Sequence, residues 1–183
     1  MTNTEHHYHS LRQLGSDLVS GVLGLRAFRA EVTALLRERF DCDQVVLWRT
    51  GRDPQDRQFR CVAERHGERV DLDGDHRLSV PEMHAYLEHL LRSGAYTAPA
   101  RGALDGPIGS QALRMHPSGA SNMLHAAATY NGRILGIVCC ERNDPHRGWS
   151  PVEQVELRRM AARIALYVGT LAEREAETTE AQS

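Results

Sequence analysis

The sequence contains no lysine, no C-x-x-C pair and no long apolar run. All 22 basic residues are arginine, and they nearly balance 24 acidic residues, which gives a net charge of −2. This balance offers no electrostatic reason to expect binding to nucleic acid or to an anionic membrane. No apolar run approaches about 18 residues, so no transmembrane helix is predicted. The polar N-terminus also lacks the apolar core of a signal peptide, and we therefore expect a cytoplasmic protein.

The remaining composition is that of an ordinary globular protein. Apolar residues make up 41% of the chain and charged residues 25%, which is close to the average for soluble domains. A chain of 183 residues is long enough for one domain with a substantial core and flanking helices. No repeat or low-complexity tract interrupts it, so a single domain is predicted.

The four cysteines predict core packing rather than redox or zinc chemistry. Cys42, Cys61, Cys139 and Cys140 lack the spacing of a zinc clip or a thioredoxin-type couple. Cys139 and Cys140 are neighbours in a predicted strand, so their side chains point to opposite faces of the sheet. Free cysteine is among the most often buried residue types, which favours packing over a vicinal disulfide.

The histidines do not predict a metal site either. His6, His7 and His9 form a terminal tract without cysteine or acidic partners. His84 and His89 are five residues apart on a predicted helix, whereas two ligands on one helix face need a spacing of four. No metal site is therefore predicted, and the identity of any cofactor is left open.

Two apolar runs flank Asn131-Gly132 and predict a β-hairpin over residues 122–142. Asn-Gly favours a two-residue type I′ turn because both central positions need a positive φ. The second run, residues 133–141, is apolar almost throughout, which is typical of a central strand covered on both faces. Further strands are expected at residues 44–50, 59–65, 70–72 and 96–98.

Apolar residues spaced three and four apart predict helices at both ends of the chain. The first covers residues 10–24, and a break near Gly24 separates it from a second helix over residues 25–40. Ser-x-x-Glu capping boxes at residues 79–82 and 150–153 begin a helix to about residue 92 and a long final helix. A short helix is expected at 108–115. Residues 1–9 are expected to be disordered, and residues 172–183 form a polar tail.

Strands that lie between helices, with one antiparallel hairpin near the C-terminal end, predict an α+β domain with a central sheet. At this point the chain resembles a GAF domain, the small-molecule sensing module of bacterial signalling proteins, over residues 25–171. The most specific part is S-N-M-L-H-A-A-A-T-Y-N-G-R-I-L-G-I-V-C-C-E-R followed by R-G-W-S-P-V-E-Q. It is similar to the pattern of GAF sensors that precede histidine kinase or diguanylate cyclase modules. The upstream run D-Q-V-V-L-W, at residues 43–48, resembles the first strand of that family.

Some positions depart from the family pattern. His125 replaces the usual acidic residue, Ala127 and Ala128 stand near the Pro-Ile positions, and Cys140 occupies a position where many relatives have histidine. These differences concern the identity of a ligand more than the fold.

The resemblance implies a central antiparallel sheet of about six strands. Terminal helices would cover one face, and short helices and loops on the other would enclose a pocket. In the family such a pocket holds a cyclic nucleotide, haem, bilin, metal centre or small metabolite, and fold alone does not choose among them. The Cys-His pair that attaches bilins and the Asn-Lys…Phe-Asp-Glu set of cyclic-nucleotide binders are absent here. The pocket candidates are Trp48, Tyr86, His89, Met115, His116, Met123, His125 and Cys139.

We predict no enzymatic activity. Some GAF-like proteins are free methionine-R-sulfoxide reductases, which use a nucleophilic and a resolving cysteine between the early strands and the hairpin. The chain has no cysteine between Cys61 and Cys139. It also lacks Ser-His-Asp spacing, a Gly-rich phosphate loop and a paired-carboxylate motif.

The two terminal helices carry matching apolar seams, which predict a homodimer with a helical interface. Ligand binding would then bias helix packing and pass the change to a signalling output module. A ligand-free structural dimerisation module, with a pocket filled by its own side chains, is the alternative. The predicted interface residues are Leu11, Leu14, Leu18, Val22, Leu157, Met160, Ile164, Val168 and Leu171.

Overall fold

The Asn131-Gly132 turn forms the hairpin that the sequence predicts. In the computed structural model, β6 (Asn122–Tyr130) and β7 (Arg133–Arg142) pair antiparallel, and Tyr130 lies opposite Arg133. Asn131 and Gly132 have φ angles of 48° and 74°, as a type I′ turn requires. The structure describes residues 3–51, 55–98, 106–118, 122–144 and 146–180.

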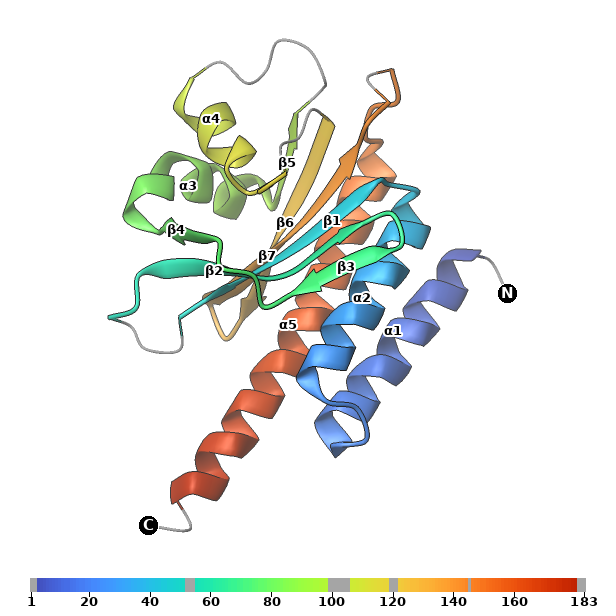
Figure 1. Ribbon diagram of the computed structural model, residues 1–183, viewed down its shortest axis with the longest axis vertical. Helices are drawn as coiled ribbons and strands as arrows, with labels where there is room; N and C mark the ends of the chain where they lie inside the picture. Colours follow the sequence, from blue (N-terminus) through green and yellow to red (C-terminus); the bar gives the residue numbers. More distant parts are fainter. Residues whose placement is uncertain (1–2, 52–54, 99–105, 119–121, 145, 181–183) are drawn as a thin grey trace.

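One antiparallel sheet forms the centre of the domain (Figure 1). Six of its seven strands follow the order β3-β2-β1-β7-β6-β5, and the seventh, β4, pairs with β2 beside this path. Gly136 of β7 lies opposite Arg49 of β1, and a Cβ at Gly136 would stand 2.0 Å from the Trp48 carbonyl oxygen. The close approach of these two strands therefore needs glycine. The remaining strands are β1 (Gln44–Thr50), β2 (Gln58–His66), β3 (Arg69–Leu72), β4 (Arg77–Ser79) and β5 (Ala95–Ala98).

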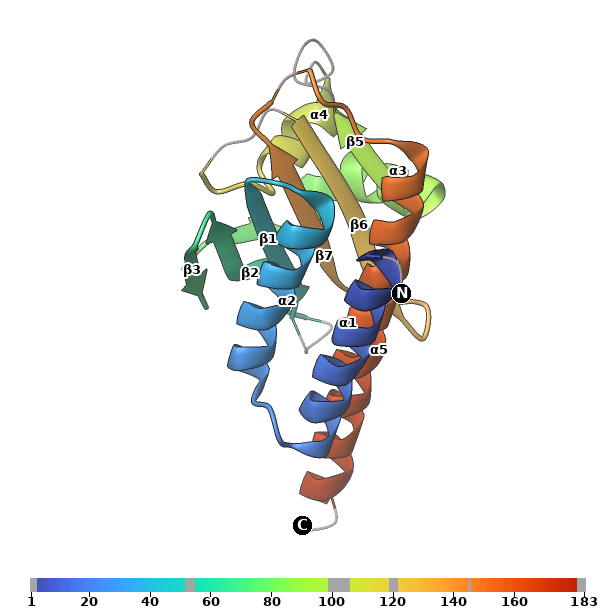
Figure 2. The same cartoon turned by 90° about the vertical axis from the view of Figure 1, so that its right-hand side faces the viewer.

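Three long helices cover one face of the sheet (Figure 2). They are α1 (Asn3–Ser20), α2 (Leu25–Phe40) and α5 (Pro151–Glu180). α2 packs on β1 and β2, α5 packs on β6 and β7, and α1 lies outside against α2 and α5. The first hydrophobic core fills the space between these helices and the sheet. The antiparallel sheet and its terminal helices confirm the predicted α+β fold.

One expectation for the ends of the chain is wrong, and the structure adds a detail to the other. Helix α1 begins at Asn3, so residues 3–9 are helical rather than disordered. Helix α5 continues to Glu180, so most of the predicted polar tail is helical. Residues 1–2 and 181–183 lie outside the described residues.

The apolar seams of α1 and α5 pack mainly inside the subunit. Five of the nine residues predicted at a dimer interface are at most 7% exposed: Leu11, Leu18, Leu157, Met160 and Ile164. Leu14, Val168 and Leu171 are half-buried against the same core. The three-helix layer already buries the side chains of these five residues, which leaves little of their surface for a second subunit. Val22 is exposed, in the turn between α1 and α2.

Short helices cover the other face of the sheet: η1 (Pro81–Met83), α3 (His84–Ser93) and α4 (Pro107–Leu113). Ser79 belongs to β4, and the turn η1 has no side-chain cap. The capping box predicted at residues 79–82 is therefore wrong, because strand pairing with β2 takes precedence there. α3 ends at Gly94 in the left-handed conformation, as predicted.

The second capping box is confirmed at the start of α5. The Glu153 backbone N–H donates to Ser150 Oγ over 3.2 Å, and the Glu153 carboxylate accepts from the Ser150 backbone N–H over 2.8 Å. Each contact satisfies a donor that the first turn of a helix leaves unpaired. The box fixes where the helix begins.

Replacing Ser150 with alanine is expected to lower the free energy of unfolding by about 1 kcal/mol, because the cap bond to Glu153 is lost. Urea denaturation monitored by circular dichroism measures this. Ser16→Ala, on the exposed face of α1, is the matched control and should leave stability unchanged or slightly raised. Equal losses in both variants would contradict the capping role.

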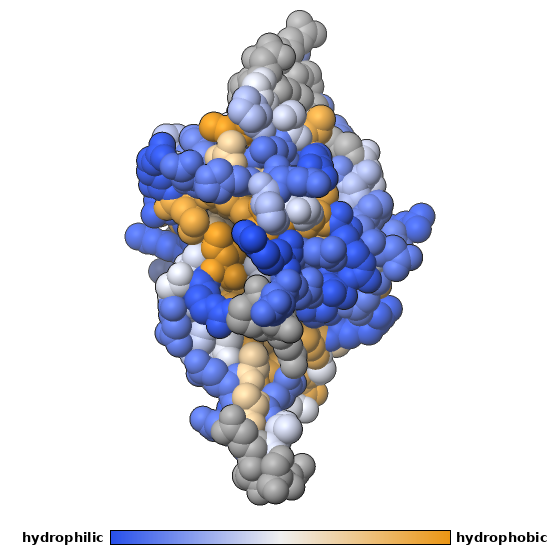
Figure 3. Space-filling view, turned by 90° about the vertical axis from the view of Figure 1, so that its left-hand side faces the viewer, coloured by the Kyte–Doolittle hydropathy of each residue, from blue (hydrophilic) through white to orange (hydrophobic). Residues whose placement is uncertain are grey.

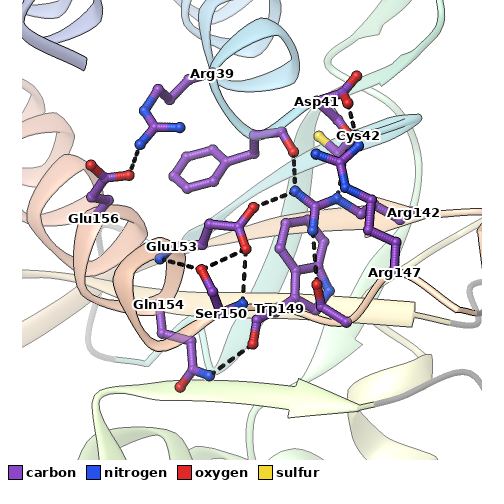
Figure 4. Close-up of polar contacts among 12 residues, drawn as sticks. Arg39, Asp41, Cys42, Arg142, Arg147, Trp149, Ser150, Glu153, Gln154 and Glu156 are labelled. Carbon is purple, nitrogen blue, oxygen red and sulfur yellow. Dashed lines mark hydrogen bonds and ion pairs between the residues drawn. The ribbon is translucent and has the colours of Figure 1, made fainter. Parts of the chain in front are cut away.

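Arg142 at the end of β7 joins the sheet to α5 (Figure 4). Its side chain is 2% exposed, and its guanidinium forms an ion pair with Glu153 and lies 3.8 Å from the Trp149 ring centroid. It also donates to the carbonyl oxygens of Phe40, Asp41 and Gly148. Arg142 thus connects α2, β7 and α5 through Trp149 and Glu153 of the family-like motif.

Candidate functional site

A second hydrophobic core lies between the sheet and the layer of η1, α3 and α4. Seven of the eight predicted pocket residues meet there and are at most 3% exposed: Trp48, Tyr86, Met115, His116, Met123, His125 and Cys139. The eighth, His89, is half-buried on α3 and contacts the edge of the Tyr96 ring. We call the region enclosed by the seven residues the sheet chamber.

Five polar side chains form a continuous hydrogen-bonded chain through the sheet chamber. Tyr86 Oη lies 2.8 Å from His125 Nδ1, and His125 Nε2 lies 2.7 Å from His116 Nε2. His116 Nδ1 lies 3.0 Å from Gln44 Oε1, and Gln44 Nε2 donates to Glu64 Oε1 over 2.7 Å. The chain therefore runs from the buried Tyr86 to the partly exposed Glu64.

The direction of every hydrogen bond follows from the acceptor at its end. Glu64 accepts, so the Gln44 amide nitrogen faces Glu64 and its oxygen faces His116. His116 Nδ1 must then carry a proton, which leaves its Nε2 as an acceptor. His125 Nε2 donates to it, and Tyr86 Oη donates to His125 Nδ1. One consistent set of neutral tautomers thus satisfies the whole chain.

Burial keeps these groups uncharged. Desolvation lowers the pKa of His116 to about 3 and the pKa of His125 well below its usual value, where His116 lowers it further. Desolvation also raises the pKa of Tyr86 well above 10. A charged imidazole in this apolar surrounding has no carboxylate in its direct hydrogen bonds, so the neutral form is favoured.

The structure also brings three metal-ligating side chains together. One ligand atom each from His116, His125 and Cys139 lies within 4.8 Å of the others, and all three residues are buried. His125 and Cys139 are directly opposite each other on β6 and β7. His116 follows α4, where the carbonyl of Met115 accepts a 2.8 Å bond from Trp48 Nε1. Two strands and one anchored segment thus position the cluster.

Cys61 and Cys139 do not have the environment of catalytic nucleophiles. Burial raises the pKa of Cys61 to about 12 and the pKa of Cys139 well above its usual value. A reactive thiol needs a lowered pKa and access to solvent, which neither thiol has. This environment argues against a nucleophilic role for these two side chains.

Sequence reasoning missed Gln44 and Glu64 in the polar chain. The sequence assigns Gln44 only to a strand, where it precedes the apolar run of residues 45–48. In the structure its side chain is 1% exposed. A polar residue on an inward-facing strand position is a signal that could have been used. Glu64 offers no such signal, because its role depends on the register of β1 against β2.

Removing the Tyr86 hydroxyl is expected to lower the free energy of unfolding by about 1–3 kcal/mol, because His125 Nδ1 is left as a buried acceptor without a donor. Urea denaturation of Tyr86→Phe measures the effect. Tyr130→Phe is the matched control, since the Tyr130 hydroxyl bonds Glu173 at an exposed site. The control should change stability by about 0.5 kcal/mol or less. A similar loss of unfolding free energy in both variants would contradict the Tyr86–His125 hydrogen bond.

The outer surface over the sheet chamber is mixed in polarity (Figure 3). Apolar side chains appear between hydrophilic ones on the side of the molecule that carries α3 and α4. Gln111 of α4 accepts a 2.9 Å bond from the Tyr86 backbone N–H, and Arg114 pairs with Glu82. These contacts tie α3 and α4 to each other, so the two helices form one cover over the chamber.

An antiparallel sheet with terminal helices on one face and a covered polar cluster on the other defines a small α+β domain. The GAF domain family matches residues 25–168, which is more than half of the chain. The chain therefore belongs to the GAF domain family, whose members are typically small-molecule sensory or regulatory modules. In the described part of the chain, none of the helices has the length and hydropathy needed to cross a bilayer.

Solved structures show the same fold. The GAF domain of an Acinetobacter phosphoenolpyruvate-protein phosphotransferase has a TM-score of 0.65 at 15% identity, covering 96% of this chain and 97% of that one. A phycocyanobilin-bound GAF domain from a cyanobacterial phytochrome has a TM-score of 0.72 at 15% identity, with 95% and 98% covered. The GAF domain of ptsP from Coxiella burnetii gives 0.65 at 17% identity, with 96% and 99% covered. No curated protein sequence matches significantly.

Proposed function

We propose that this chain is a sensory module that binds a small ligand in the sheet chamber and signals through its terminal helices in a homodimer. The observation that supports this most is the polar chain from Tyr86 to Glu64 inside an otherwise apolar core. Buried polar networks often add less stability than well-packed apolar side chains of the same volume. A function that uses these groups gives a reason for placing them there.

The fold and the buried position of the polar chain support a small molecule as the ligand. One structurally similar GAF domain is bound to phycocyanobilin, so the fold can hold a small molecule. In this chain the chamber is filled by its own side chains, and a ligand would enter by displacing the cover formed by α3 and α4. That step would change the hydrogen bonds of Tyr86, which belongs to the cover and to the polar chain.

The route from the chamber to the helices is short. His125 and Cys139 face the chamber, whereas their strand neighbours Leu124 and Cys140 belong to the core beneath α2 and α5. A shift of β6 or β7 would therefore move side chains in both hydrophobic cores, one on each face of the sheet. Arg142 attaches the end of β7 to the first turn of α5, so the same shift would reach the start of the final helix.

The exposed side of α5 is the surface that we assign to dimerisation. Val152, Val155 and Leu166 are 65%, 42% and 47% exposed, and Ala162 and Arg159 lie between them on the same exposed face. The spacings of three, four, three and four residues form a continuous stripe, as in a helical interface. We call these five residues the α5 stripe. It replaces the seam of buried leucines as the contact between subunits.

Native mass spectrometry and light scattering of protein purified without added ligand test the proposal. A dimer with extra mass that is lost on denaturation supports ligand binding and association together. A dimer at the bare polypeptide mass, with no thermal shift on adding extracts of small metabolites, would favour the structural dimerisation module. A monomer at tens of micromolar would contradict signalling through a helical dimer.

Leu166→Arg is expected to weaken dimerisation at least tenfold, because each subunit loses a buried leucine worth about 1.5–3 kcal/mol and gains a charge at the interface. Light scattering across a concentration series measures this. Leu91→Arg on α3 is the matched control, since Leu91 is also an exposed leucine, at 55%, but lies on the cover. Equal weakening in both variants would place the interface elsewhere.

A further inference from the structure

We propose that His116, His125 and Cys139 form the binding site for a single copper(I) ion. The inference names the ligand class of the sheet chamber and so rests on the proposed function. Two imidazoles and one thiol whose ligand atoms lie within 4.8 Å of one another make a donor set for a soft or borderline d-block ion. All three residues are buried, which would exclude water from the ion.

Both histidines already have the outer partners that metal-ligating histidines use. His116 Nδ1 donates to Gln44, and His125 Nδ1 lies 2.8 Å from Tyr86 Oη. Such contacts fix ring orientation and leave Nε2 for the metal. The two Nε2 atoms are 2.7 Å apart. Metal–nitrogen bonds of about 2.0 Å would place them about 3.3–3.5 Å apart, so the rings need to separate by less than about 1 Å.

Binding has a simple proton balance. Cys139 gives its thiol proton to solvent and bonds the ion as a thiolate. His125 exchanges the proton on Nε2 for one on Nδ1, and Tyr86 Oη then accepts from Nδ1 instead of donating to it. One proton is therefore released for each copper(I) ion bound, and no electron is transferred.

Charge selects copper(I) over a divalent ion. Copper(I) with one thiolate and two neutral imidazoles has no net charge, whereas zinc(II) with the same ligands has a charge of +1. An uncompensated charge is costly in a site without water. Zinc also prefers a fourth ligand in a tetrahedral arrangement, while the cluster in the described residues supplies three. A neutral three-coordinate site thus fits copper(I) better.

Anaerobic titration of the full chain with copper(I), in competition with the chromophoric chelator bicinchoninate, tests the site. One ion per chain is expected in the wild-type protein, and Cys139→Ser should weaken binding at least 100-fold. Cys140→Ser is the matched control, because Cys140 is the next residue, is also buried, and belongs to the core on the other face of the sheet. Tyr86→Phe should weaken binding about 10–100-fold.

The surface histidines of α1 need their own control. His6 and His9 are exposed and could bind copper(I) without the chamber. A His6→Gln/His9→Gln variant should keep the full affinity. Binding that disappears in this variant, or that is unchanged in Cys139→Ser, would overturn the proposal.

X-ray absorption of the copper-loaded wild-type protein keeps the test independent of whether the variants fold. One sulfur at about 2.2–2.3 Å and two imidazole nitrogens at about 2.0 Å are expected. A copper coordination shell without sulfur would overturn the site. Zinc that is bound by the same three ligands and is not displaced by copper(I) would overturn the choice of metal. A bound organic molecule with no copper affinity would overturn this inference and leave the proposed function standing. Protein that binds neither added copper(I) nor any organic molecule would overturn both.

Discussion

Lowering the pH from 7 to 5 is expected to reduce the free energy of unfolding of the metal-free protein by about 4 kcal/mol. His116 and His125 are neutral in the folded protein, because desolvation lowers the pKa of His116 to about 3 and that of His125 well below its usual value. In the unfolded chain each has a pKa of about 6.5 and is protonated at pH 5. Each buried histidine therefore costs about 2 kcal/mol at pH 5.

The direction of this pH dependence follows from the number of protons that the folded and unfolded states bind. The unfolded state binds more protons than the folded state below about pH 6.5, so stability falls as the pH falls, and it does so until the folded-state pKa is reached near 3 for His116. Above about pH 7 both states hold neutral imidazoles, and these two residues add no pH dependence. The pKa of Glu153 is lowered beside Arg142. The stability that Glu153 contributes is therefore lost only at a lower pH than the range from 7 to 5 in which the two histidines act.

Urea denaturation of chelator-treated protein at pH 7, 6 and 5 measures the effect. His84→Gln is the control, because His84 is exposed on α3, and this variant should keep the full pH dependence. Stability that differs by less than about 1 kcal/mol between pH 7 and pH 5 would show that the histidines are not buried as neutral groups.

The fold could be predicted from the sequence where local signals and tertiary structure agree. Asn131-Gly132 encodes its own turn, and Ser150 with Glu153 encodes its own helix start. Ser79 failed as a cap because the same residue pairs with Gln58 across two strands. A capping pattern reports only local preference, and strand pairing at that point depends on residues about 20 positions away.

The candidate site was predicted as a set of residues, but its chemistry was not. Apolar and histidine positions named Tyr86, His116, His125 and Cys139 as neighbours of one chamber. The cluster depends on the register that sets His125 opposite Cys139 and on the fold that returns Gln44 to His116. Neither follows from spacing along the chain. The same limit applies to the predicted interface, since a seam of apolar residues does not show whether its partner lies in the same chain.

Arg142→Ala is expected to lower the free energy of unfolding by about 3–5 kcal/mol. The substitution leaves the Glu153 carboxylate without its buried cation, and removing one member of a buried pair is strongly destabilising. It also removes the donor from the carbonyl oxygens of Phe40, Asp41 and Gly148. Arg142→Lys should recover only part of the loss, because one ammonium group cannot reproduce the planar set of five donors.

Urea denaturation with Arg133→Ala as the matched control measures this. Arg133 lies at the other end of β7 and is exposed, so its loss should change stability by about 0.5 kcal/mol or less. A double-mutant cycle with Glu153→Ala separates the ion pair from the carbonyl contacts. If Arg142 only stabilises the fold, its loss should leave dimerisation unchanged at temperatures well below unfolding. If it also transmits strand movement to α5, as proposed, ligand-dependent changes in helix packing should disappear while ligand binding remains.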